Sequence, residues 1–259
     1  MHYVPRRQRD SITVVAPLLL AIGSLGLLAI LWRRSAAPRV ERTRRRRQPD
    51  AEPARTPTVP LHSDEQCSAD GTGALIHRCY EVSLPLTGLV AADLLRLMQR
   101  HLTELAPSAL ADFEKTIGSE TSFRVGDEYN ITMLGPWNGR VRVSELTELA
   151  FTLVTLDGHP EAGHITFSVG DSVPPGTARV QIESWARARD AIVNTAYATL
   201  GIGKQVQTEV WITFLQRLGA LAGAADTPQV RITTEEIPEA SNTKMDTADQ
   251  TTSPAPRAS

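Results

Sequence analysis

The sequence predicts an α+β fold in which an antiparallel sheet wraps around a long C-terminal helix, preceded by one transmembrane helix. Three patterns support this prediction: an uncharged N-terminal run, several segments of period two, and a helical apolar stripe near the C-terminus. We divide the chain into an N-terminal flank (1–10), a transmembrane helix (11–32), a basic and proline-rich tether (33–62), a folded domain (63–225) and a disordered tail (226–259).

The predicted membrane span runs from Ser11 to Trp32 and contains no charged residue. A helix needs about 20 apolar residues to cross the hydrocarbon core, so its length is sufficient. More arginines follow the span than precede it, which places the C-terminal domain in the cytoplasm of a single-pass cell-membrane protein. Export of the domain is the alternative, and the twin-arginine pattern that it would require is incomplete.

Charge is distributed unevenly along the chain. Residues 1–60 carry 12 basic and 4 acidic side chains, whereas residues 61–225 carry 12 basic and 19 acidic ones. An acidic domain is not expected to bind nucleic acid. The basic run Arg42–Arg47 lies next to the predicted span, so we expect it to contact anionic lipid headgroups.

The folded domain begins with a strand over 75–84, followed by a helix over 89–105. The apolar spacing of Leu110, Phe113 and Ile117 then predicts a second, short helix that ends near Gly118. Between 126 and 182 apolar and polar residues alternate in five segments separated by glycine and proline turns, which predicts an antiparallel meander.

A long helical region is predicted from Asp190 to Leu218, with an interruption near Gly201 and Gly203. It is the only predicted element long enough to cover one face of the sheet. A curved sheet that grips such a helix is similar to the START and Bet v 1 class, which commonly keeps a cavity between sheet and helix.

Four segments carry a closer resemblance: Asn138–Val141, Thr155–Gly163, Ile182–Arg187 and Gln205–Gln207. Together they resemble the DUF1990 family (also called UPF0548), over about residues 78–223. The most specific parts are the turn that contains Gly158, His159, Glu161 and Gly163 and the strand end Ser184–Arg187. The resemblance supports the fold and implies no particular reaction.

The turn also contains the strongest metal-like cluster, which comprises His159, Glu161 and His164. Three ligands without the HExxH spacing make a poor metal site, so we expect hydrogen bonds that hold the hairpin and no metal or cofactor. Glu183 and His164 form a conceivable acid–base pair, but the alternation places Glu183 on the solvated face. We therefore predict no catalytic residues.

The two cysteines, Cys67 and Cys79, do not form a zinc pattern. Cytoplasmic placement favours free thiols over a disulfide, which would require an oxidising compartment.

Large side chains on the predicted inner surface would line a ligand pocket or simply fill the core. The candidates are Tyr129, Met133, Trp137, Phe151, Phe167, Tyr197, Trp211 and Phe214. The function that we predict is the binding of a hydrophobic or amphipathic small molecule, such as a lipid or isoprenoid, near the membrane. The alternatives are a membrane-tethered protein-interaction module and a cyclase or hydrolase that uses the same pocket.

Overall fold

The protein is described by a computed structural model for residues 40–46, 62–133, 138–172, 174–191, 193 and 202–239. The predicted membrane span, Trp137 and Tyr197 lie outside these residues. No helix in the described ranges is both long and apolar enough to cross a membrane.

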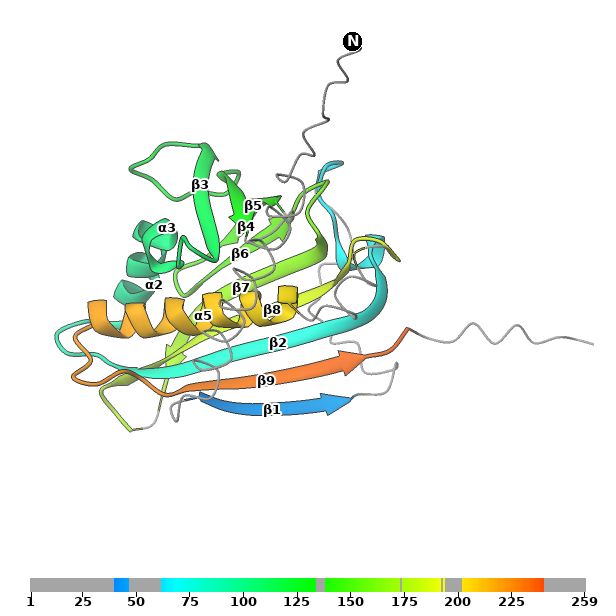
Figure 1. Cartoon of the computed structure of the whole chain (residues 1–259). Coiled ribbons are helices and arrows are strands. Elements are labelled where there is room, and N and C mark those ends of the chain that lie inside the picture. Colours follow the sequence, from blue (N-terminus) through cyan, green and yellow to red (C-terminus); the bar gives the residue numbers. More distant parts are fainter. Residues whose placement is uncertain are drawn as a thin grey trace, which may run out of the picture.

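The described residues form an α+β fold with one nine-stranded sheet (Figure 1). The strands are β1 (Val40–Arg46), β2 (Thr72–Pro85), β3 (Ala111–Ile117), β4 (Glu128–Met133), β5 (Asn138–Leu146), β6 (Ala150–Thr155), β7 (Glu161–Asp171), β8 (Thr177–Ala188) and β9 (Val230–Ile237). The helices are the short 3-10 helix η2 (Ser68–Asp70), α2 (Ala91–Arg100), α3 (Leu102–Leu105) and α5 (Ile202–Leu221).

Strand order in the sheet is β1-β9-β2-β8-β7-β6-β5-β4-β3. From β9 to β3 in this order, every strand pairs antiparallel with its neighbour, as the alternating pattern predicts. However, β1 pairs parallel to β9, so the sheet is mixed and not purely antiparallel. This is a correction to the predicted fold class.

The long helix α5 lies across one face of the sheet, and α2 and α3 cover the end of that face near β3 (Figure 1). The predicted stripe of α5 is buried: Val206, Val210, Phe214, Leu215 and Leu218 are at most 6% exposed. Apolar residues from β2, β7 and β8 pack against them, which makes one continuous core. The sequence pattern therefore correctly predicted which helix the sheet grips.

The second predicted helix is wrong. Residues 111–117 form strand β3, in which Phe113 pairs with Ile131 and Lys115 pairs with Tyr129. The spacing of Leu110, Phe113 and Ile117 fits a helix, but burial alternates along the strand. Pairing with β4 satisfies the backbone there, so tertiary context overrides the local pattern.

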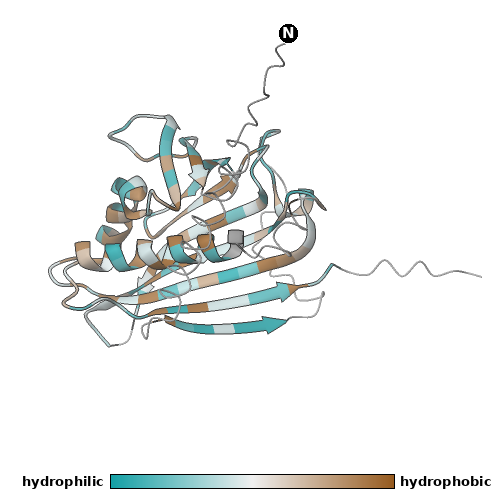
Figure 2. Cartoon of the chain, viewed as in Figure 1, coloured by the Kyte–Doolittle hydropathy of each residue, from teal (hydrophilic) through white to brown (hydrophobic). Residues whose placement is uncertain are grey.

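Two segments that we expected to lack structure contribute strands. Residues 40–46, within the predicted tether, form β1, and residues 230–237, within the predicted disordered tail, form β9. Val230 and Ile232 are buried, whereas β1 is almost entirely hydrophilic (Figure 2). A polar edge strand discourages further strand pairing, so the composition of β1 suits its position at the edge.

Candidate functional site

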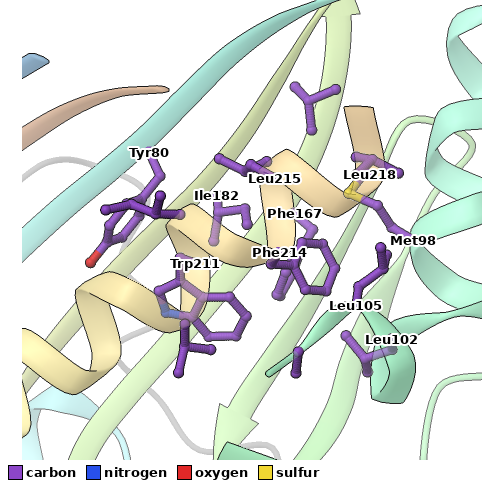
Figure 3. Close-up of a cluster of buried hydrophobic side chains, with 14 of the residues drawn as sticks. Tyr80, Met98, Leu102, Leu105, Phe167, Ile182, Trp211, Phe214, Leu215 and Leu218 are labelled. Atoms are coloured by element: carbon purple, nitrogen blue, oxygen red, sulfur yellow. The ribbon is translucent and has the colours of Figure 1, made fainter. Parts of the chain in front are cut away.

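Most aromatic pocket candidates form the packed core. The rings of Phe151 and Phe167 stack with centroids 4.5 Å apart, and Trp211 packs edge-on to Phe167 at 5.4 Å (Figure 3). Phe214 completes the group 5.8 Å from Trp211. Phe151, Phe167 and Phe214 are fully buried, so they fill the interior and leave no space for a ligand between them.

The remaining candidates lie at the margins of this core. Met133 is half-buried at the end of β4 and packs against it. Tyr129 is buried, and desolvation, with the nearby carboxylates of Asp127 and Glu120, raises the pKa of its hydroxyl. Trp211 reaches a small internal cavity.

The internal cavity lies between the sheet and α5 and has a volume of about 60 Å³. This is well below the roughly 300 Å³ of an ordinary ligand pocket, so it admits only a group of a few heavy atoms. Apolar side chains from β3 to β7 and polar ones from β6, the turn, β8 and α5 line it: Phe113, Ile131, Val141, Leu153, Thr155, His159, Glu161, His164, Ile165, Ser184, Ala186, Gln207 and Trp211.

His159 holds the turn that leads into β7. Its Nδ1 lies 3.0 Å from the backbone nitrogen of Glu161 and 2.9 Å from the carbonyl oxygen of the same residue. Which of these two groups it bonds depends on the tautomer of the ring. Complete burial lowers the pKa of His159 to about 4. The ring also rests on Gly139, where an added Cβ would come within 2.1 Å of His159 Cδ2, so the glycine makes room for the histidine.

A second close approach explains Gly163. A Cβ at this position would lie 2.0 Å from the carbonyl oxygen of Trp185 on β8, and the backbone has φ of +156°. The turn thus packs so closely against Ser184–Ala186 of β8 that only glycine fits at position 163. Residues that carry the family resemblance meet at one end of the helix–sheet interface.

A hydrogen-bonded chain crosses this end of the interface. Nη1 of Arg78 on β2 donates to Oε1 of Gln207 on α5, and Nε2 of Gln207 donates to Oε2 of Glu161 at 2.9 Å. Gln207 thereby bridges a buried guanidinium and a half-buried carboxylate of opposite charge. The two charges compensate each other, so the site favours neutral over ionic ligands.

Trp211 presents an unpaired donor in this region. Its side chain is 6% exposed, and Nε1 has no hydrogen-bond partner within the described structure. Figure 3 shows the nitrogen on the side of the ring that points away from Phe167 and Phe214. Since buried donors are nearly always paired, this nitrogen is the atom of the site that most needs a ligand.

The three residues of the metal-like cluster, His159, Glu161 and His164, all line the cavity. Nδ1 of His159 contacts the backbone of Glu161. Within the described ranges, no three His, Cys, Asp or Glu side chains are placed to hold a metal ion.

The acid–base pair also does not form. Oε1 of Glu183 lies 2.7 Å from Nε2 of His77, and this hydrogen bond lowers the pKa of the carboxyl. His164 is buried, and desolvation lowers its pKa to about 4. Both cysteines are free thiols, and burial raises the pKa of Cys79 to about 11.

A larger groove of about 560 Å³ opens where α2 and α3 meet the loop between β3 and β4. Its volume lies within the usual range of small-molecule sites. The lining comprises Arg96, Gln99, Arg100, Leu102, Thr103, Glu104, Lys115, Glu120, Thr121, Ser122, Phe123 and Tyr129. Of the predicted pocket residues, Tyr129 is part of this groove.

Comparison with protein families supports the resemblance seen in the motifs. Residues 110–217 match the family described as "Domain of unknown function (DUF1990)". The chain contains a DUF1990 domain. The match runs from β3 into α5 and includes Gly139, His159, Glu161, Gly163 and Gln207, but Arg78 lies before it. No curated protein sequence matches the chain.

Solved structures resemble the DUF1990 chain at low identity. Norcoclaurine synthase from Thalictrum flavum is 14% identical, with 59% of this chain and 95% of that chain covered and a TM-score of 0.39. Ara h 8.0201 is 12% identical, with 52% of this chain and 98% of that chain covered and a TM-score of 0.33. The di-domain ARO/CYC StfQ of the steffimycin biosynthetic pathway is 14% identical, with 60% of this chain and 52% of that chain covered and a TM-score of 0.40.

Reasoning from the sequence missed Arg78, Gln207 and the groove. Arg78 lies in a strand of mixed character, and Gln207 lies between Val206 and Thr208 in a helix, so neither has a local signal. Gln207 belongs to the segment Gln205–Gln207 that carries the family resemblance, which is how the sequence could have indicated it.

Proposed function

We propose that the DUF1990 domain binds a mainly apolar small molecule that carries one neutral oxygen, a hydroxyl or carbonyl, in the internal cavity. The observation that carries this proposal is that Trp211, whose buried Nε1 has no hydrogen-bond partner among the described residues, lines the cavity. An oxygen of the ligand would accept its hydrogen bond, and the hydrocarbon next to that oxygen would contact Phe113, Ile131 and Leu153.

The energetics favour such a ligand. A buried donor without a partner costs about 1–3 kcal/mol, which a ligand oxygen recovers. Arg78 and Glu161 compensate each other through Gln207, so neither an anion nor a cation gains from entering. The cavity volume limits what enters to the oxygen-bearing end of a longer molecule or to a small alcohol or ketone.

The test follows the four indole N–H signals of the full-length protein labelled with ¹⁵N-tryptophan. Addition of 2-propanol should shift the Trp211 signal in a saturable manner, because its proton gains an acceptor. The titration is then repeated with 1-octanol. If the cavity holds the end of a longer molecule, 1-octanol should bind more tightly than 2-propanol, and if it holds only a small free ligand, it should not.

Two variants make the assignment specific. Trp211→Phe keeps an aromatic ring in the core and removes the donor, and it should weaken 2-propanol binding at least fivefold. Trp185→Phe, on β8 against His77, should leave binding unchanged. If neither alcohol moves the Trp211 signal, or if both variants bind as the wild type does, the proposal is wrong.

We also propose that residues 11–32 anchor this domain in the membrane, with Arg42–Arg47 near anionic lipid and the domain in the cytoplasm. Support comes from the uncharged run and the flanking arginines. The full-length chain should remain in the membrane pellet after an alkaline carbonate wash, and release into the supernatant would contradict the proposal.

A further inference from the structure

The groove beside α2 and α3 has ligand size, and its lining combines apolar side chains such as Leu102 and Phe123 with charged ones. Phe123 from the loop reaches into it and contacts Phe151 edge-to-face, with centroids 4.8 Å apart. The loop is held in place by Lys115, whose Nζ donates to the carbonyl oxygens of Ser119 and Ser122 and to Asp127. The groove is therefore a built feature of the domain.

The three bonds of Lys115 use all three donors of its ammonium group. It forms an ion pair of 2.6 Å with Asp127, and both side chains are buried, so Lys115 contributes structure and not a free charge. Glu104 on α3 also lines the groove, and its carboxylate lies 2.7 Å from Nδ1 of His101 in an exposed pair.

The cations that remain for a ligand lie on α2. Arg100 on α2 makes no hydrogen bond or ion pair with the described residues, and Arg96 pairs only with the exposed Asp93. Exposed pairs of this kind contribute little, so Arg96 can turn to a ligand at small cost. Glu120 lies in the loop between β3 and β4, which also lines the groove.

We infer that this groove binds a small amphipathic anion, with its carboxylate, sulfonate or phosphate on Arg100 and Arg96 and its apolar part on Phe123. Guanidinium groups suit these anions because their N–H donors match two oxygens at once. The ring of Phe123 and the aliphatic stems of the arginines supply the apolar contact. The site is separate from the internal cavity, which favours neutral ligands.

The experiment compares two fluorescent probes on the full-length protein: 8-anilino-1-naphthalenesulfonate, which is an amphipathic anion, and N-phenyl-1-naphthylamine, its uncharged counterpart. Arg100→Gln should weaken binding of the sulfonate about 5- to 10-fold, because one charge-assisted contact is lost. Glu120→Gln should tighten it, because a like charge disappears. Neither variant should change binding of the uncharged probe more than twofold.

Arg124→Gln is the matched control, since Arg124 is an exposed arginine one residue beyond Phe123 and outside the groove lining. It should leave both probes unaffected. Equal effects of Arg100→Gln and Arg124→Gln, or equal effects on the two probes, would overturn the inference. The Trp211→Phe variant should bind the sulfonate normally, so failure of the cavity proposal and of this one can be told apart.

Discussion

The imidazole of His77 stacks flat on the indole of Trp185, with ring centroids 3.7 Å apart and planes within 6°. Both ring nitrogens meet carboxylates: Nε2 lies 2.7 Å from Glu183 and Nδ1 lies 3.1 Å from Glu235. The ring on β2 thereby connects β8 and β9 across the sheet face opposite α5.

This connection predicts that Glu235 secures β9. Glu235→Ala removes the partner of Nδ1, so backbone amides of β9 should exchange faster in hydrogen–deuterium exchange, with a loss of about 1–3 kcal/mol in the free energy of unfolding. Glu236→Ala is the control, because its pair with Arg44 is exposed and worth little. Equal protection of β9 in the two variants would contradict the prediction.

The second prediction concerns the C-terminal boundary. A chain that ends at residue 225 loses β9 and the burial of Val230, Ile232 and Ile237. Each buried aliphatic side chain contributes about 1.5–3 kcal/mol, so this chain should unfold at a much lower temperature or fail to fold. A chain that ends at residue 239 should melt like the full-length protein, as measured by circular dichroism. Similar melting of both chains would show that β9 is dispensable.

The third prediction concerns the contact of Gly139 with His159. Gly139→Ala forces its Cβ against the imidazole and should destabilise the protein by about 1–3 kcal/mol. Removing the ring with His159→Ala should relieve this clash, so the double variant should lose less stability than the sum of the two single variants. Urea unfolding measures all four proteins.

Gly170→Ala serves as the control for that cycle. At Gly170 the nearest atom to an added Cβ is Arg179 Nη2 at 3.9 Å, which is ordinary contact. Its effect on stability should be smaller. Additive effects in the double variant would show that Gly139 and His159 are not coupled.

The fourth prediction concerns pH. His159 and His164 have pKa values lowered to about 4 by burial, against 6.5 for the ordinary side chain. The folded state therefore holds them neutral, and the stabilisation is complete above pH 6.5. As the pH falls from 6.5 to 4 the unfolded chain takes up protons first, so stability drops by as much as about 3 kcal/mol for each histidine.

Urea midpoints between pH 7.5 and pH 4.5 measure this effect. His164→Gln should flatten the pH dependence, whereas His101→Gln should not, since His101 lies at the surface against Glu104. A midpoint that does not change over this range would refute the assignment of neutral, buried histidines.

Pattern in the sequence was sufficient where one face of an element is buried and the element is regular. The alternation in β4 to β8 and the stripe of α5 follow directly from side-chain periodicity. It failed at β3, where Leu110, Phe113 and Ile117 have helical spacing although residues 111–117 form a strand. It also failed at β1 and β9, which pair with each other although they are almost 200 residues apart in the sequence. Such non-local pairing leaves no local signal.

For the candidate site, the sequence identified the turn of His159 and Glu161 and the aromatic residues. It did not show which of the aromatic residues fill the core and which line a cavity. Phe151 and Phe167 look like Trp211 in sequence, yet of the three only Trp211 lines the cavity and has a buried polar atom without a partner among the described residues. Likewise, Arg100 lines a groove only because the loop between β3 and β4 folds back toward α2.

The sequence by itself determined the class of the fold, the helix that the sheet grips and the turn that carries the family resemblance. These features depend on periodicity and on short-range turn chemistry, which a linear sequence contains. Only the tertiary structure decided the roles of individual side chains, including the Arg78–Gln207–Glu161 chain, the His77 bridge and the groove at α2. Each of them joins residues many positions apart, and their contacts exist only after the strands have paired and α5 has packed against the sheet.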